Sequence, residues 1–185
     1  RAGTPAPWAA ALPGVPDALE ATLRAAGGWL GGEGRSCVEA FAAAGEALVV
    51  SRGHNFATAL ELALKLKETG RIFADGYSTA DLLHGPVAVA GPEVPTLAIR
   101  PDGPAGRAVD DAVAIAVRRG IVPWTIGGAE VAGRERSLVV AETLPEPLTP
   151  LAYVLPGFLV AEAVARARGR DPDAPPGLTK VTRTR

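Results

Sequence analysis

The sequence is poor in the residues that form disulfides and thiol-bound metal centres. Its 185 residues include one cysteine, Cys37, so no disulfide can form within the chain and no cluster of thiolates can hold a metal. A lone thiol suits a reducing compartment, and we expect a cytoplasmic protein that needs no metal and no cofactor. Methionine is absent even at position 1, which we interpret as a chain that begins inside a longer gene product or has been processed.

Excess charge and long apolar runs are also missing. Nineteen basic and 20 acidic residues leave a formal charge of -1, so no overall field attracts nucleic acid or an anionic membrane surface. The longest apolar stretch, residues 151–161, is about half of what a bilayer span needs and contains Pro156 and Gly157. The N-terminal RAGTPAPW lacks the pattern of a signal peptide. We therefore expect neither a nucleic-acid partner nor a membrane partner.

Lysine is scarce, because arginine outnumbers it 16 to 3. Arginine serves equally for surface charge, but only lysine readily gives up a proton or forms an imine. Lys65, Lys67 and Lys180 are therefore candidates for chemistry. Three solvated surface lysines would give the same count, so both interpretations stay open at this point.

The length favours one domain with a real core. Residues 1–16 contain four prolines and predict a linker or lead-in, followed by a single domain over residues 17–185. Apolar periodicity and turn residues predict helices and strands that alternate from residue 47 onward. The expected strands are 47–51, 95–100, 121–126 and 137–140, and the expected helices are 17–30, 36–44, 55–69, 106–119 and 149–168.

Strands that alternate with helices require crossover connections, which produce a parallel sheet covered on both faces. The sequence thus predicts an α/β three-layer sandwich with a parallel, doubly wound sheet of four or five strands. A short helix is expected after a capping box, Ser78-x-x-Asp81. In such sheets ligands bind beyond the carboxyl ends of the strands, and we expect the reactive side chains to face that edge.

The helix over 55–69 carries a charged stripe. Glu61, Lys65 and Glu68 are spaced i, i+4 and i+7, so carboxylate, ammonium and carboxylate follow one another on one face. The same spacing is typical of a solvated face stabilised by ion pairs. His84, one of two histidines, precedes a Gly-Pro turn and could act as an acid or base near neutral pH, or be purely structural. The loop after residue 51, SRGHN, joins strand to helix where backbone N–H groups could meet an anion.

Four motifs together resemble one known family. The run ALELALKLKE is followed by HGP, with SRG at the end of a strand before them and LTKVT near the C-terminus. This ordered set resembles the SIS (sugar isomerase) family over most of the chain. It is similar to the second of two SIS halves in the isomerase part of glutamine:fructose-6-phosphate amidotransferases, and to the SIS-type glucosamine-6-phosphate deaminases. The tail that ends soon after LTKVT is closer to the deaminases.

The resemblance implies a sugar phosphate as substrate, a flavodoxin-like fold and a homodimer whose subunits share the active site. Glu68 matches the base that moves a proton between C1 and C2 of the open-chain sugar through an enediol, and Lys65 matches a lysine near the reacting oxygens. His84 matches a histidine of ring opening that reaches the site from the neighbouring subunit. The remaining candidates are Lys180, which would close over the sugar, and Ser51, Gly53 and Glu61, which would bind substrate.

The sequence also departs from the family. The Ser-rich phosphate-binding loop of the first SIS half does not occur in these residues, and neither does the glutaminase domain. The chain therefore corresponds to the C-terminal half of a two-SIS protein, or to a half that binds without turnover. A non-catalytic sugar-phosphate sensor is the main alternative function. A nucleotide-binding domain fits the fold class but lacks a Gly-x-Gly-x-x-Gly turn after its first strand.

Overall fold

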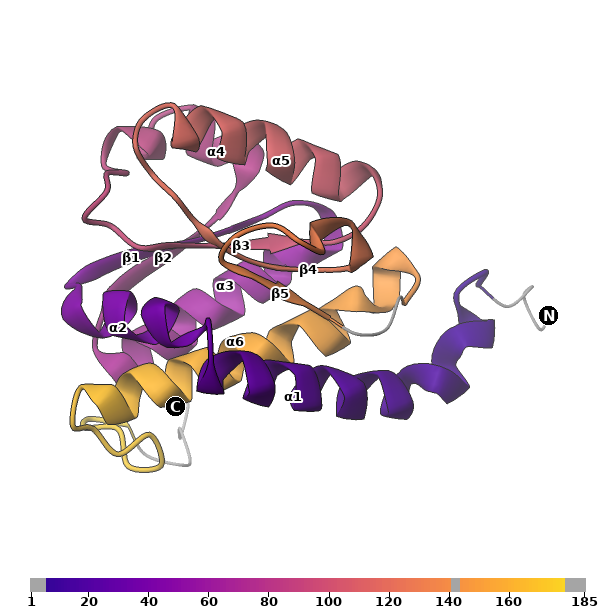
Figure 1. Ribbon diagram of the computed structural model, residues 1–185, viewed down its shortest axis with the longest axis horizontal. Coiled ribbons are helices and arrows are strands. Elements are labelled where there is room, and N and C mark those ends of the chain that lie inside the picture. Colours follow the sequence, from indigo (N-terminus) through magenta and orange to yellow (C-terminus); the bar gives the residue numbers. More distant parts are fainter. Residues whose placement is uncertain (1–5, 141–143, 179–185) are drawn as a thin grey trace, which may run out of the picture.

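The computed structural model describes residues 6–140 and 144–178. Figure 1 shows one sheet with helices on both of its faces. The five strands are β1 (Glu46–Ser51), β2 (Phe73–Ser78), β3 (Thr96–Arg100), β4 (Trp124–Gly127) and β5 (Ser137–Val139). They are all parallel and lie in the order β2-β1-β3-β4-β5, so the connections reverse direction beside β1. The expected parallel, doubly wound sheet is confirmed.

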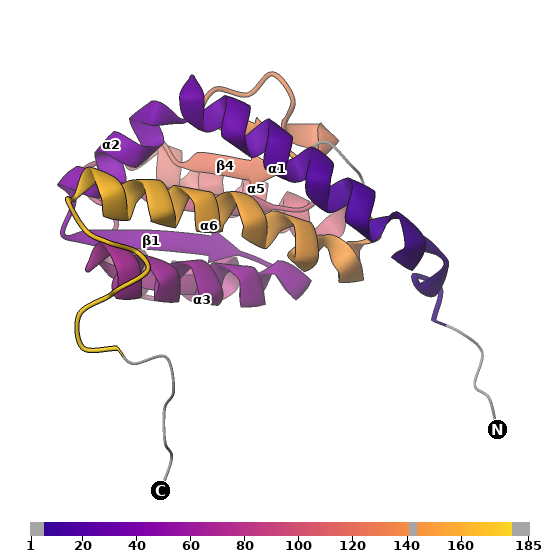
Figure 2. The same ribbon diagram turned by 90° about the horizontal axis from the view of Figure 1, so that it is seen from below.

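Two unequal helical layers cover the sheet. One face carries α4 (Thr79–Leu83) and α5 (Pro104–Val117). The other carries α1 (Val15–Gly31), α2 (Arg35–Ala43), α3 (Phe56–Lys65) and α6 (Thr149–Ala167). Figure 2 shows α6 lying between α1 and α3, so this late helix is flanked by two helices from the first half of the chain. Residues 9–14, expected within the lead-in, form a 3-10 helix that continues directly into α1.

The core consists of two apolar clusters separated by the sheet. The larger lies under α1, α2, α3 and α6 and includes Phe41, Leu62 and Trp124. The smaller lies under α4 and α5 and includes Val50, Leu82 and Val109. Alternate strand residues supply the two clusters, because successive side chains of a strand point to opposite faces. Val49 and Val50, both fully buried, belong to different clusters for this reason.

Helix α6 is apolar over most of its surface, with Glu162 and Arg166 as its charged side chains. With the turn before it, Glu146–Ala167 is long and apolar enough to cross a membrane, yet 56% of its most apolar window is buried inside the domain. A core helix of a globular domain meets the same criterion, and α6 packs on α1, α2 and α3. Proline at position 156 and glycine at position 157 are accommodated within the helix.

Three local expectations need correction. β2 was not among the expected strands, because its sequence FADGYS contains Asp75 and Gly76, residue types that are depleted in strands. Ser78 does precede α4, but its hydroxyl accepts a hydrogen bond from Arg52 and does not cap the helix. The helix expected over 55–69 is regular only to Lys65 and continues as a π-helical turn, Leu66–Gly70.

Candidate functional site

Lys65 and Glu68 are in contact where α3 continues into the π-helical turn. Lys65 Nζ donates a hydrogen bond to Glu68 Oε2 over 2.6 Å and lies 3.7 Å from Glu61 Oε1. Both side chains of the short ion pair are about 30% exposed. π-Turns are rare, and they occur often at functional sites because they displace side chains from helical register. The carboxylate-ammonium-carboxylate stripe is thus present, with its closest contact at the turn.

The ion pair fixes the charge of the lysine. The hydrogen bond to Glu68 raises the pKa of the Lys65 ammonium, and partial desolvation opposes this less strongly. The Coulombic attraction of Glu68 and Glu61 acts in the same direction as the hydrogen bond. Lys65 is therefore a cation at neutral pH. It can stabilise a developing oxyanion, and as long as it keeps its proton it is unsuited to act as the base.

A pocket of about 360 Å³ opens between α3 and α6 beside this pair. Glu61 and Lys65 lie on its α3 wall, while Phe158 and Glu162 lie on its α6 wall. Arg166, one turn further along α6, donates a 2.9 Å hydrogen bond from Nε to Glu162. Thr69, Ala161 and Pro172 complete the lining. The pocket therefore combines charged groups on both helices with the apolar side chains of Phe158, Ala161 and Pro172.

This pocket lies away from the edge of the sheet where we expected it. Helix α3 begins after the carboxyl end of β1 and runs antiparallel to that strand. Its last residues therefore lie near the amino ends of the strands. Phe73, the first residue of β2, donates its N–H to Gly45, just before β1, which places the end of the π turn near the amino edge. The expectation that Glu68 faces the carboxyl edge is wrong, because a crossover helix runs antiparallel to the strand before it.

Ser51 and Gly53 do lie at the carboxyl edge. Ser51 is fully buried and donates its hydroxyl hydrogen bond to the Ile99 carbonyl of the neighbouring strand. Gly53 has a φ of +65°, and a Cβ there would fall 2.9 Å from Glu146 Oε1, so this position requires glycine. Both residues lie at the opposite end of α3 from Glu68, and the structure does not bring them to the pocket.

His84 and Glu68 lie on opposite faces of the sheet. His84 directly follows α4 and is exposed, whereas Glu68 ends the helix on the α3–α6 side. One chain therefore cannot present both side chains to one substrate. Lys180, the fourth predicted catalytic residue, lies outside the described residues.

A charged network occupies the carboxyl edge near β3 and β4. Arg100 is 2% exposed, and its guanidinium contacts the carboxylates of Asp102, Asp110 and Glu130. Asp102 also accepts backbone N–H groups from the turn after β4, at residues 129 and 130. Arg134 adds a second cation to Asp110. The charged groups of this network are paired with one another, and they connect the loops that follow β3 and β4. This is the place where doubly wound sheets usually bind ligands.

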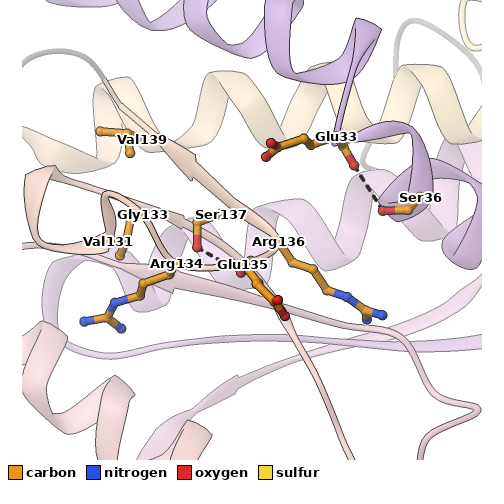
Figure 3. Close-up of a pocket in the computed structure, with 9 residues that line it drawn as sticks. All are labelled: Glu33, Ser36, Val131, Gly133, Arg134, Glu135, Arg136, Ser137 and Val139. Atoms are coloured by element: carbon orange, nitrogen blue, oxygen red, sulfur yellow. Dashed lines mark hydrogen bonds between the residues drawn. The ribbon is translucent and has the colours of Figure 1, made fainter.

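A larger hollow of about 610 Å³ lies beside the edge strand β5 (Figure 3). Its two hydroxyls are already bonded to backbone carbonyls, Ser36 to Glu33 and Ser137 to Glu135. The side chains of Arg134 and Arg136 extend in opposite directions, and Arg136 stacks on Trp124 at 4.6 Å. No pair of an acid and a base converges there among the labelled residues. We therefore favour the smaller pocket at Lys65.

The residues of α6 that line this pocket were not predicted from the sequence. Phe158 and Glu162 are separated from Lys65 by about ninety residues, and their own sequence shows only an apolar helix with an i, i+4 ion pair. No local signal connects them to α3. Among residues 6–140 and 144–178, no group of three or more His, Cys, Asp or Glu side chains is placed to hold a metal ion.

Comparison with known proteins gives the family. The model of the SIS domain matches residues 40–130, which contain the Lys65–Glu68 pair and His84. Over 139 residues the chain is 34% identical to a glutamine--fructose-6-phosphate aminotransferase [isomerizing] of Sphingobium yanoikuyae, which covers 73% of this chain and 89% of that protein. The chain belongs to the SIS domain family. The resemblance recognised from the four motifs is confirmed.

Other relatives of this SIS domain are much longer. The aminotransferase of the same description from Thermococcus kodakarensis is 38% identical over 132 residues, which are 71% of this chain and 22% of that protein. Among solved structures, a proposed phosphosugar isomerase of Silicibacter pomeroyi is 28% identical with a TM-score of 0.70 and covers 89% of this chain and 47% of its own. This SIS domain thus spans about a fifth of the first relative and about half of the solved one.

Proposed function

We propose that this SIS domain takes part in proton transfer between C1 and C2 of a sugar phosphate, with Glu68 as the base. The observation that carries the proposal is the 2.6 Å contact between Glu68 Oε2 and Lys65 Nζ. Lys65 lines the α3–α6 pocket, and Glu68 lies next to that lining through this contact. Aldose-ketose interconversion passes through an enediol. It needs a carboxylate within reach of two adjacent carbons and a cation near the oxygens that become negative.

The residues divide this work between them. Glu68 removes the proton from one carbon and returns it to the other, while the Lys65 ammonium stabilises the enediolate oxygen. Glu61 holds the lysine from its other side at 3.7 Å. The apolar side chains of Phe158 and Ala161 on the α6 side suit the C–H face of a sugar and lower the local dielectric.

Two parts of the reaction are assigned to a second SIS domain and to another copy of the chain. The substrate phosphate needs several donors, and the donor side chains that line the pocket, Lys65 and Thr69, are already bonded. Lys65 donates to Glu68, and the Thr69 hydroxyl donates to the Lys65 carbonyl. We assign phosphate binding to a second SIS domain. Ring opening by His84 would act on the substrate of another chain, because His84 lies on the far face of the sheet from Glu68.

Exchange of substrate hydrogen with solvent tests the proton transfer alone. Fructose 6-phosphate or glucosamine 6-phosphate is incubated with the protein in deuterated water, and deuterium at C1 and C2 is followed by NMR. We expect incorporation that falls by about 10²- to 10⁴-fold in Glu68→Gln. Glu20→Gln, on an exposed glutamate of α1, is the matched control. Undiminished exchange in Glu68→Gln would remove the proposed base, and ammonia released from glucosamine 6-phosphate would distinguish deamination from isomerisation.

A binding module is the second candidate function. The absence of the Ser-rich phosphate loop from this sequence favours it, because a sensor domain can rely on weaker contacts than an enzyme. A sensor would be stabilised against heat by the sugar phosphate without any deuterium exchange. Stabilisation accompanied by exchange would favour the enzyme.

A further inference from the structure

We propose that Glu162 of α6 recognises the sugar hydroxyls that lie between the reacting carbons and the phosphate. The inference rests on the proposed function, because it concerns the same pocket and takes the Lys65–Glu68 pair to hold C1 and C2. It goes beyond that function in assigning the choice among sugars to a helix that carries none of the predicted catalytic residues.

Helix α6 presents a short group of side chains to the pocket from one face. Phe158, Ala161 and Glu162 are spaced i, i+3 and i+4, so they lie next to one another, and all three line the pocket. Directly beside them α6 is in close contact with α3, where Gly157 meets the Leu62 side chain. These α6 residues therefore face α3 across a cavity of about 360 Å³, which is large enough for a small ligand.

Arg166 holds the Glu162 carboxylate through one of its two oxygens. The Nε and Nη2 atoms of Arg166 each lie 2.9 Å from Glu162 Oε1. Within residues 6–140 and 144–178, no hydrogen bond occupies the other oxygen, Oε2. An ionised carboxylate accepts hydrogen bonds and donates none, and each of its oxygens has two lone pairs. Glu162 is thus oriented by its neighbour and keeps acceptor capacity, which suits it to bind hydroxyl groups.

The other charges of the pocket determine how a sugar phosphate lies in it. Lys65 is paired with Glu68 and Glu61 on its own side of the pocket. Carboxylates line both helices, Glu61 on α3 and Glu162 on α6, and they repel the negatively charged phosphate. The phosphate therefore lies outside this pocket and the carbon chain inside it. With C1 and C2 at Lys65 and Glu68, the hydroxyls of the next carbons are the ones that can reach α6.

Phe158 makes the α6 side of the pocket selective for a carbohydrate. It is 37% exposed and stands one helical turn before Glu162, so an aromatic ring and an acceptor are neighbours. The face of an aromatic ring carries partial negative charge and attracts C–H hydrogens that point at it. A sugar chain offers C–H groups and hydroxyl groups side by side, whereas an apolar ligand offers only the former. Phe158 and Glu162 together match a polyhydroxylated chain.

Calorimetric titration with two ligands tests the role of Glu162. Dihydroxyacetone phosphate shares the ketone, hydroxymethyl and phosphate groups of fructose 6-phosphate but has no hydroxyl-bearing carbon between the ketone and the phosphate-bearing carbon. Glu162→Gln should bind fructose 6-phosphate about 10-fold more weakly, because a charge-assisted hydrogen bond is lost, and dihydroxyacetone phosphate no more weakly than before. Glu20→Gln, which breaks the matching exposed i, i+4 pair with Arg24 on α1, should change neither affinity.

Three results of this titration would overturn the proposal. They are equal weakening of both ligands by Glu162→Gln, undiminished affinity of that variant for fructose 6-phosphate, and no binding of fructose 6-phosphate to the unmodified chain. The thermal transition of Glu162→Gln should match that of Glu20→Gln, because both substitutions break a pair of partly exposed side chains.

Two further measurements separate this role from the proposed function. Sugar C–H protons over the Phe158 ring should shift upfield in the NMR spectrum of bound fructose 6-phosphate, and Phe158→Leu should remove the shift; a spectrum without it contradicts the placing of the sugar on α6. In Glu162→Gln, kcat/KM for deuterium exchange should fall by the same factor as affinity, through a higher KM. Sugar binding that depends on Glu162 without any exchange would remove the proposed base and leave the hydroxyl contact standing, while exchange with an unaltered KM in Glu162→Gln would do the reverse.

Discussion

Gly157 of α6 and Leu62 of α3 are so close that a side chain at position 157 would require Leu62 to move. A Cβ there would overlap both methyl groups of Leu62. Leu62 lies between Glu61 and Lys65 in the sequence and points into the core, while those two side chains line the pocket. The contact therefore sets the separation of the two helices that form the pocket walls.

Gly157→Ala should destabilise the domain. Alanine favours a helix interior by about 1 kcal/mol over glycine, but overpacking a core costs about 1–3 kcal/mol and should outweigh it. Urea unfolding measures the difference. The control is Gly28→Ala in α1, where a Cβ meets no atom within 4 Å and a gain of about 0.4–1 kcal/mol is expected. A Gly157→Ala protein as stable as the unmodified one would show that α3 and α6 are free to separate.

Arg100→Met should cost about 1–3 kcal/mol of unfolding free energy, because three partly exposed carboxylates lose the hydrogen bonds of their shared cation. Arg100 itself is 2% exposed and contacts all three. Chemical denaturation gives the value. Arg24→Met breaks an exposed pair with Glu20 and should change stability by less than about 0.5 kcal/mol. Similar effects at the two positions would mean that the network does not hold the β3 and β4 loops.

Stability should fall in acid because of Asp110. Partial burial acts to raise the pKa of Asp110, but hydrogen bonds from Arg134 and Arg100 outweigh it and keep that pKa below its ordinary value. A lowered folded-state pKa contributes stability above the unfolded pKa, near 4, and this is lost as pH falls through the folded value. Asp110→Asn should therefore be less stable at neutral pH, and its deficit should shrink below about pH 4. A deficit independent of pH would assign the effect to packing.

Cys37 should be unreactive in the folded protein. Burial raises the pKa of its thiol to about 12, although Arg136 opposes this, and the side chain has no exposure. The thiolate is the reactive form, so a thiol reagent at pH 8 should modify Cys37 only after denaturation. Rapid labelling of the native protein would show that α2 separates from the sheet. Denatured protein labelled to one equivalent is the control for reagent and protein concentration.

The order of motifs was sufficient to predict the family, and the alternation of strands and helices was sufficient to predict the parallel sheet. Both the order of motifs and the alternation of elements can be seen in the sequence without knowledge of tertiary contacts. The adjacency of Lys65 and Glu68 was predictable for the same reason, because residues three apart on one helix are neighbours whatever surrounds them. The π turn that shapes their contact has no comparable signal in KLKETG.

Strand β2 shows where a prediction from the strand propensities of single residues failed. Gly76 weakens a strand by itself, but here a Cβ at residue 76 would fall 2.8 Å from the Ala59 carbonyl of α3. Glycine is required by the close packing of the helix on the strand. That requirement comes from tertiary contact, so propensity alone predicts a loop at this position.

The residues alone determined which side chains on α3 stand together and what charges they bring. Packing determined the rest: that Phe158 and Glu162 form the second wall of the pocket, that the pocket lies toward the amino edge of the sheet, and that His84 is on the other face. Periodicity reports only on neighbours within one element, whereas these relations depend on how elements far apart in the chain fill the space between them.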